Sequence, residues 1–187
     1  MKKLLLLNLL TMAVYSHPCI AQTIDNNAIP EGNAKLVVGK VDGKPETYVF
    51  PNDLTVGYNC IVHNNGESIP DRTTEIIFMR TFEKGGKQTD VSVNLHIEPN
   101  SIGNFPLDPD VLDKPLPSGS ISIDFNNTEG PFLGQDPSKG TSGSITITQY
   151  PAAAGSYITG TFKAILNDEN GNHYYVSGEF RVKRVNQ

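Results

Sequence analysis

Apolar residues in this chain recur at every second position, in short runs separated by glycine, proline, asparagine and aspartate. Successive side chains of a β-strand point to opposite faces, so this alternation is typical of strands with one buried face. Residues 54–63 alternate in this way, and so do residues 89–98. No stretch of useful length shows the helical spacing of about 3.6 residues. The pattern therefore predicts an all-β protein.

Nine strands are predicted from these runs and from the turn residues that flank them. They cover residues 35–41, 46–50, 54–63, 73–82, 89–98, 119–126, 143–150, 156–167 and 172–184. Nine strands exceed what one half-covered sheet usually carries, which favours two packed sheets. The long connections at 99–118 and 127–142 suit crossings between two sheets better than the short turns of an up-and-down barrel. We therefore predict a single-domain antiparallel β-sandwich of about nine strands.

The last two predicted strands contain an internal repeat, in which residues 157–162 (YITGTF) resemble residues 175–180 (YVSGEF). The apolar residues of both strands carry even numbers, so residues that face each other across the hairpin must have numbers with an even sum. This parity requires an odd loop, residues 169–171. Gly171 then takes the left-handed conformation of a type I turn followed by a bulge.

The predicted pairing, in which paired residue numbers sum to 340, gives the repeat a structural role. Gly160 lies opposite Phe180 in this register, and Phe162 lies opposite Gly178. Each ring then covers a glycine of the neighbouring strand, an arrangement that shields a weak strand position. The repeat therefore needs no functional explanation.

The first 21 residues predict export. Lys2 and Lys3 precede an apolar stretch at 4–14, and the Cys-Ile-Ala sequence at 19–21 supplies the small residues of a cleavage site. The apolar stretch is far shorter than the roughly 20 residues that a membrane-spanning helix needs. The sequence therefore predicts an exported protein without a transmembrane helix.

Cleavage after Ala21 would divide the chain into three segments. These are a signal peptide at 1–21, a flexible leader at 22–33 and the β-sandwich domain at 34–187. Cys19 offers the alternative of a lipid anchor, but the Ser-His-Pro sequence before it lacks the aliphatic and small residues that such a site requires. Release into the periplasm, onto the outer surface or into the medium is the preferred interpretation.

The mature chain is acidic, which bears on its partners. The signal peptide carries two of the 15 Lys and Arg residues and none of the 20 Asp and Glu residues, so 13 − 20 gives a mature net charge of −7. Nucleic acids and anionic membranes favour clustered cations, and the only short basic run lies at 181–184. We expect no nucleic-acid partner.

Cysteine and histidine positions give no catalytic or zinc motif. Cys60 is the single cysteine of the mature chain, which excludes an internal disulfide. On an alternating strand Cys60 shares the apolar face, whereas His63 points the other way, so the two do not form a thiol–imidazole pair. The remaining histidines, His96 and His173, complete none of the usual zinc spacings. We predict no catalytic residues and expect surface histidines.

Asp108, Asp110 and Asp113 are the candidate metal ligands, and calcium is the only cofactor that they indicate. Calcium binds several oxygen ligands from a loop that wraps it. This segment lacks the bending glycine and the closing glutamate of an EF-hand, and its prolines limit wrapping. The alternative is an acidic, proline-punctuated surface connection.

Three short segments carry a resemblance to other proteins. They are the VDGK sequence at 41–44, the SGSITI sequence at 142–147, and the closing pair GTF at 160–162 and GEF at 178–180. In these segments the chain resembles a group of small exported bacterial β-sandwich proteins without assigned activity, many of them lipid-anchored. The resemblance implies the fold and the compartment, and it implies no catalytic residues.

We expect a non-catalytic binding or interaction protein of the bacterial envelope or secretome, whose partner is an envelope protein or a glycan. Loops carry binding sites more often than sheet faces do, which directs attention to 99–118 and 127–142. A glycan would use aromatic rings, and the candidates are Tyr48, Tyr150, Tyr157, Tyr174 and Tyr175. The hairpin register places Tyr157, Tyr175 and Ile165 on one outward face, either as a small apolar patch or because both faces of the hairpin are covered. Edge-strand decoration or partial burial is the preferred interpretation.

Two alternatives remain open. One is a secreted hydrolase whose groups converge only in three dimensions, around His96 and the aspartates at 108–113. The other is an inhibitor-like protein, for which a flat apolar patch with a polar rim would be the sign.

Overall fold

The computed structural model describes residues 34–41, 43–50, 58–64, 72–98, 101–107, 117–126, 131–151, 153 and 155–184, and for 58–64 it describes the backbone alone. The predicted signal peptide and leader lie outside these ranges.

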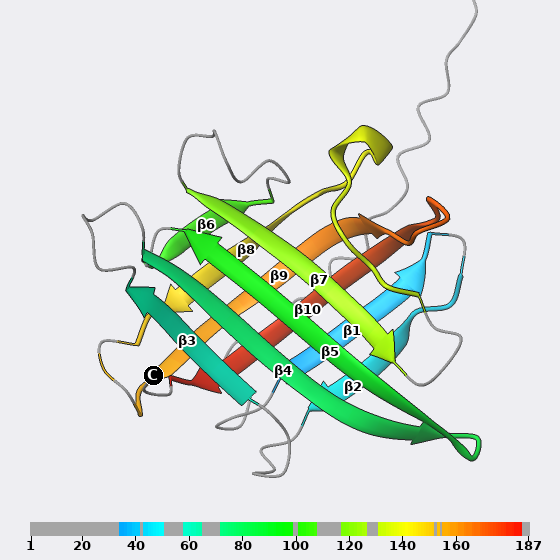
Figure 1. Cartoon of the computed structure of the whole chain (residues 1–187), viewed down its shortest axis with the longest axis horizontal. Helices are drawn as coiled ribbons and strands as arrows, with labels where there is room; N and C mark the ends of the chain where they lie inside the picture. The colour runs from blue at the N-terminus through cyan, green and yellow to red at the C-terminus, as the bar shows by residue number, and fades with distance from the viewer. Residues whose placement is uncertain are drawn as a thin grey trace, which may run out of the picture.

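Ten strands form two antiparallel sheets in the described part of the chain. The six-stranded sheet has the order β2-β1-β10-β9-β8-β6 and the four-stranded sheet the order β3-β4-β5-β7. The strands are β1 (Ala34–Lys40), β2 (Glu46–Phe50), β3 (Tyr58–Asn64), β4 (Arg72–Lys84), β5 (Lys87–Glu98), β6 (Gly103–Pro106), β7 (Ser118–Asn126), β8 (Ser142–Gln149), β9 (Tyr157–Asn167) and β10 (His173–Lys183). The sheets lie face to face and their strands cross steeply (Figure 1).

This architecture confirms the predicted all-β antiparallel sandwich. Each of the nine predicted strands is present, and β6 is an additional strand within the connection predicted at 99–118. The chain passes from the four-stranded sheet to β6, returns to it at β7 and leaves it again for β8. Both long connections therefore cross between the sheets, as expected.

The core lies between the sheets and is built by the alternating apolar residues. In β5 every second residue from Val91 to Ile97 is fully buried, while the residues between them are half-buried. Phe78 of the four-stranded sheet packs against two rings of the other sheet, with centroids 5.0 Å from Phe50 and 6.4 Å from Phe162. Burying a side chain of this size contributes about 1.5–3 kcal/mol, so these rings bind the two layers together.

The β9–β10 hairpin has the predicted register. All eleven residue pairs between the two strands have numbers that sum to 340. In the turn, the N–H of Gly171 donates to the carbonyl of Asp168 at 2.9 Å, and Gly171 has a φ of 79°. The loop therefore spans residues 169–171, with glycine at the left-handed position that the parity argument requires.

The two glycines of this hairpin lie directly against aromatic rings. A Cβ on Gly160 would lie 2.7 Å from Cζ of Phe180. A Cβ on Gly178 would collide with the ring of Phe162 and would lie 2.5 Å from the carbonyl oxygen of Lys35 in β1. Neither position can hold a larger residue without displacing a fully packed neighbour.

Two short segments join the sheets by backbone hydrogen bonds. Leu133 exchanges hydrogen bonds with Ile123 of β7 at 2.8 and 2.9 Å, and the next residue, Gly134, exchanges bonds with Asn167 of β9 at 3.0 and 3.1 Å. On the same side, Leu107 donates to the carbonyl of Gly143 in β8 at 3.0 Å and also bridges to β7. These bonds close the sandwich between β7 and the β8–β9 pair.

Asp168 holds the β9–β10 turn together through its carboxylate. It accepts hydrogen bonds from the backbone N–H and the side-chain amide of Asn172 at 2.8 and 2.7 Å, and a longer one from Tyr174 at 3.5 Å. Burial alone would raise the pKa of this carboxyl. The hydrogen bonds from Asn172 and from the backbone of Asn170, together with the charge of Lys40, outweigh that effect and hold the pKa below its usual 3.8.

Replacing Gly178 by alanine is expected to destabilise the fold by about 1–3 kcal/mol, because the new methyl group overlaps the Phe162 ring and the β1 backbone. Urea unfolding followed by circular dichroism measures the loss. Ser177→Ala, at the half-buried outer position next to it, is the matched control and should cost little. Equal stability of the two variants would contradict the close packing.

Asp168→Asn is expected to lower the free energy of unfolding at pH 7 by about 1–2 kcal/mol, because the charge-assisted bonds to Asn172 are lost. The lowered pKa of Asp168 means that its contribution is present above about pH 4 and disappears as the pH falls through the folded-state value. The difference between wild type and variant should therefore shrink in acid.

Urea unfolding at pH 7 and pH 3 checks this dependence on pH. Glu169→Gln removes the same charge from the same turn and serves as the control. A difference between wild type and Asp168→Asn that is the same at both pH values would show that the carboxylate does not act through its ionised form.

Candidate functional site

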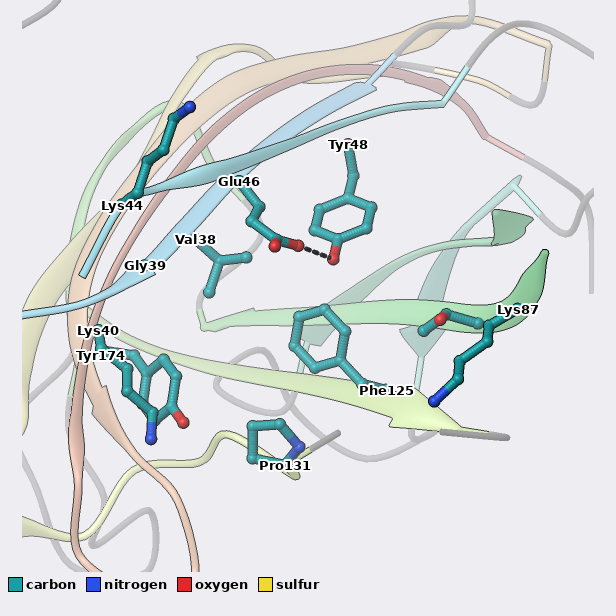
Figure 2. A pocket seen from close by; sticks show the side chains of 11 residues that line it. Val38, Gly39, Lys40, Lys44, Glu46, Tyr48, Lys87, Phe125, Pro131 and Tyr174 are labelled. Carbon is teal, nitrogen blue, oxygen red and sulfur yellow. Dashed lines mark hydrogen bonds between the residues drawn. The ribbon is translucent and has the colours of Figure 1, made fainter. Parts of the chain in front are cut away.

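The candidate site is a cavity of about 400 Å³ that opens between the two sheets. It lies where the end of β1 and the starts of β2 and β10 face the start of β5 and the end of β7. Its lining residues are Val38, Gly39, Lys40, Lys44, Glu46, Tyr48, Lys87, Thr89, Phe125, Pro131 and Tyr174 (Figure 2). Cavities of this size hold small molecules or single end groups of larger ones.

The inner wall of the cavity is continuous with the hydrophobic core. Val38, Phe125 and Tyr174 belong to the buried core cluster. Tyr48 packs edge-on against Phe82 with ring centroids 5.0 Å apart, and its centroid lies 5.8 Å from that of Phe125. The aromatic wall is therefore fixed by packing before any ligand arrives.

Glu46 and Tyr48 form a polar pair beside this wall. The Tyr48 hydroxyl donates to the Glu46 carboxylate at 2.7 Å. Burial raises the pKa of Tyr48 far above its usual 10, and the hydrogen bond to Glu46 and the charge of that carboxylate raise it further. Tyr48 therefore stays protonated near neutral pH, where it is a hydrogen-bond donor and not a base or nucleophile.

Lysines provide most of the charge at the cavity edge. Three lysines and one glutamate line it, in a chain whose net charge is −5. The ammonium group of Lys40 lies 5.7 Å from the centroid of the Tyr174 ring, within the range of a cation–π contact. Lys40 and Lys87 lie on opposite sides of Phe125, whereas the ammonium group of Lys44 points away from that ring (Figure 2).

A second hollow, of about 580 Å³, lies on the outer face of the six-stranded sheet near the β9–β10 turn. Val41, Ile165 and Tyr175 give it apolar character, and Tyr175 is about half exposed. Tyr157 is eight residues from Ile165 along β9, roughly 27 Å away at the usual rise of a strand. The three residues therefore do not form one apolar patch: Tyr175 and Ile165 line the same hollow, and Tyr157 lies elsewhere, under the guanidinium of Arg181 at 3.9 Å.

The other candidate residues do not assemble into one site. Asp108, Asp110 and Asp113 lie outside the described residues, and so do the side chains of Cys60 and His63. His96 lies on the outer face of the four-stranded sheet, and His173 is exposed at the start of β10 in the other sheet. No group of three or more His, Cys, Asp or Glu residues that could hold a metal ion occurs among the described residues.

Of the five candidate tyrosines, two line the cavity. These are Tyr48 and Tyr174. Tyr150 packs against the core, with its hydroxyl 2.7 Å from that of Thr74. The outer-face residues Tyr157 and Tyr175 lie away from the cavity.

Sequence reasoning missed the three lysines of the cavity. Lys40 and Lys44 flank the turn between β1 and β2, and Lys87 follows the turn between β4 and β5. Each turn is recognisable in the sequence, but only the packing of the two sheets brings them to one cavity.

Over the described ranges, there is no helix with the length and hydropathy needed to span a membrane.

Comparison with known protein families, with curated proteins and with solved structures found no match to this chain. The geometry of the cavity is therefore the basis on which a function is inferred.

Proposed function

We propose that this chain is an exported, non-catalytic binding protein of the bacterial envelope or secretome, and that its partner is an envelope glycan or protein. The signal-like first 21 residues support export. The single observation that carries the binding role is the cavity between the sheets, which combines a preformed aromatic wall with convergent polar groups. That combination is typical of ligand sites.

The cavity favours a projecting group over a broad, flat partner surface. Its concave shape and its volume of about 400 Å³ suit one end group of a larger molecule. A sugar unit presents C–H groups to aromatic and aliphatic walls and hydroxyl groups to polar atoms. Tyr48 and Val38 supply the first kind of contact, and Glu46 and Thr89 supply the second.

Filling the cavity is expected to abolish binding. Thr89 lines it from β5, so Thr89→Tyr should remove most of the envelope material that the immobilised chain retains. Ser142→Tyr adds the same side chain at an exposed position of β8 and is the matched control. Pro131→Trp, on another part of the lining, provides a second filling variant.

The measurement is retention of solubilised envelope on the wild-type chain and on each variant, with thermal unfolding to verify that the variants fold. Periodate-sensitive retention identifies a glycan, and protease-sensitive retention identifies a protein. If both filling variants fold and retain as much material as Ser142→Tyr, the cavity is not the binding site.

The aspartate segment allows a separate test for calcium. We expect the melting temperature to be the same with calcium and with chelator, because the segment has the composition of a surface connection. A rise in melting temperature with calcium that Asp110→Asn removes would instead identify Asp108, Asp110 and Asp113 as a calcium site.

A further inference from the structure

The charge at the cavity contrasts with the charge of the whole chain. Three of its lining residues are lysines and one is a glutamate, whereas the chain carries 15 Lys and Arg against 20 Asp and Glu. The carboxylate of the glutamate accepts a hydrogen bond from Tyr48, and its charge offsets that of one lysine. Cations around a cavity attract an anion from solution.

Two exposed lysines flank the aromatic wall of the cavity. Lys40 and Lys87 lie on opposite sides of Phe125 and come from different sheets (Figure 2). Lys40 is held at the edge by the Tyr174 ring and by the charge of Asp168. The flexible stems of both residues let their ammonium groups reach a negative group at the mouth of the cavity.

The residues that line the cavity favour a sugar over an acyl chain as the uncharged part of an anionic ligand. The apolar wall is formed by residues that are already packed in the core, Val38, Phe125 and Tyr174, each at most 8% exposed. Beside it lie Glu46 and Thr89, whose oxygens can pair with hydroxyl groups.

We propose that this cavity binds an acidic sugar unit, whose carboxylate or phosphate is held between Lys40 and Lys87 and whose ring lies against the Tyr48–Phe125 wall. The proposal rests on the binding function proposed above and adds the charge and the chemical class of the ligand. Hydroxyl groups of the sugar donate to Glu46, and its anionic group accepts from the two lysines.

Isothermal titration with monosaccharides tests the proposal directly. Glucuronate and glucose 6-phosphate are the acidic probes, one for each anionic group, and glucose is the neutral control. We expect an acidic probe to bind about ten- to 100-fold more tightly than glucose, which is the combined effect of two partly exposed charge-assisted contacts, one to each lysine. Added salt should reduce this difference.

Three lysine variants locate the contact. Lys40→Gln and Lys87→Gln should each weaken binding of the acidic probe about three- to ten-fold and leave binding of glucose unchanged. Lys163→Gln, at an exposed position of β9, removes the same charge far from the cavity and should have no effect. Lys87→Gln is the decisive variant, because Lys40 also acts on Asp168 of the hairpin turn.

The possible results separate this inference from the proposed function. Equal affinity for glucose and both acidic probes would overturn the anionic ligand and leave a glycan-binding role intact. Tighter binding of hexanoate than of glucuronate would overturn the sugar. If no probe binds but the wild-type chain still retains envelope material that Thr89→Tyr does not, the acidic sugar alone is overturned. If no probe binds and the wild-type chain retains no envelope material, the binding role is overturned as well.

Discussion

The register of the β9–β10 hairpin is the constraint on which the six-stranded sheet depends. A slip by one residue would turn Phe162 and Phe180 from the core to solvent, because strand side chains alternate between faces. The same register presents two glycines to the neighbouring strands. Gly178 lies opposite Leu36 of β1, and Gly160 lies opposite Ile147 of β8. The hairpin therefore sets the positions of the strands on both of its sides.

The cavity follows from how this sheet meets the other one. The two sheets cross steeply (Figure 1), so their corners diverge unless another segment fills them. Residues 133–134 close one side by bonding to β7 and to β9. Pro131, just before these residues, already lines the cavity. The cavity is thus the part of the inter-sheet space that remains open beside this connection, with Tyr174 of the hairpin at its edge.

The features that could be predicted from the sequence are those fixed by local parity. Alternation gives nine strands, and the even-numbered apolar residues give the odd loop at 169–171. The strand β6 could not be predicted, because Phe105 is its only buried residue and one residue shows no alternation. The cavity could not be predicted either. Lys40 and Lys87 belong to separate hairpins, and the crossing of the sheets, a non-local property, brings them together.

The lysines of the cavity take no part in the packing of the hydrophobic core. Packing explains the alternating core and the glycines of the hairpin, but the walls of the cavity are already closed by Phe125, Tyr174 and Tyr48 without any cation. Lys40 and Lys87 are both exposed, so water screens their charges. Lys40 also has favourable interactions within the sandwich, with the Tyr174 ring and with the charge of Asp168. The position of Lys40 is therefore explained in part by the hairpin turn, whereas no such interaction among the described residues accounts for Lys87, and this difference makes Lys87 the residue at which binding and stability can be separated.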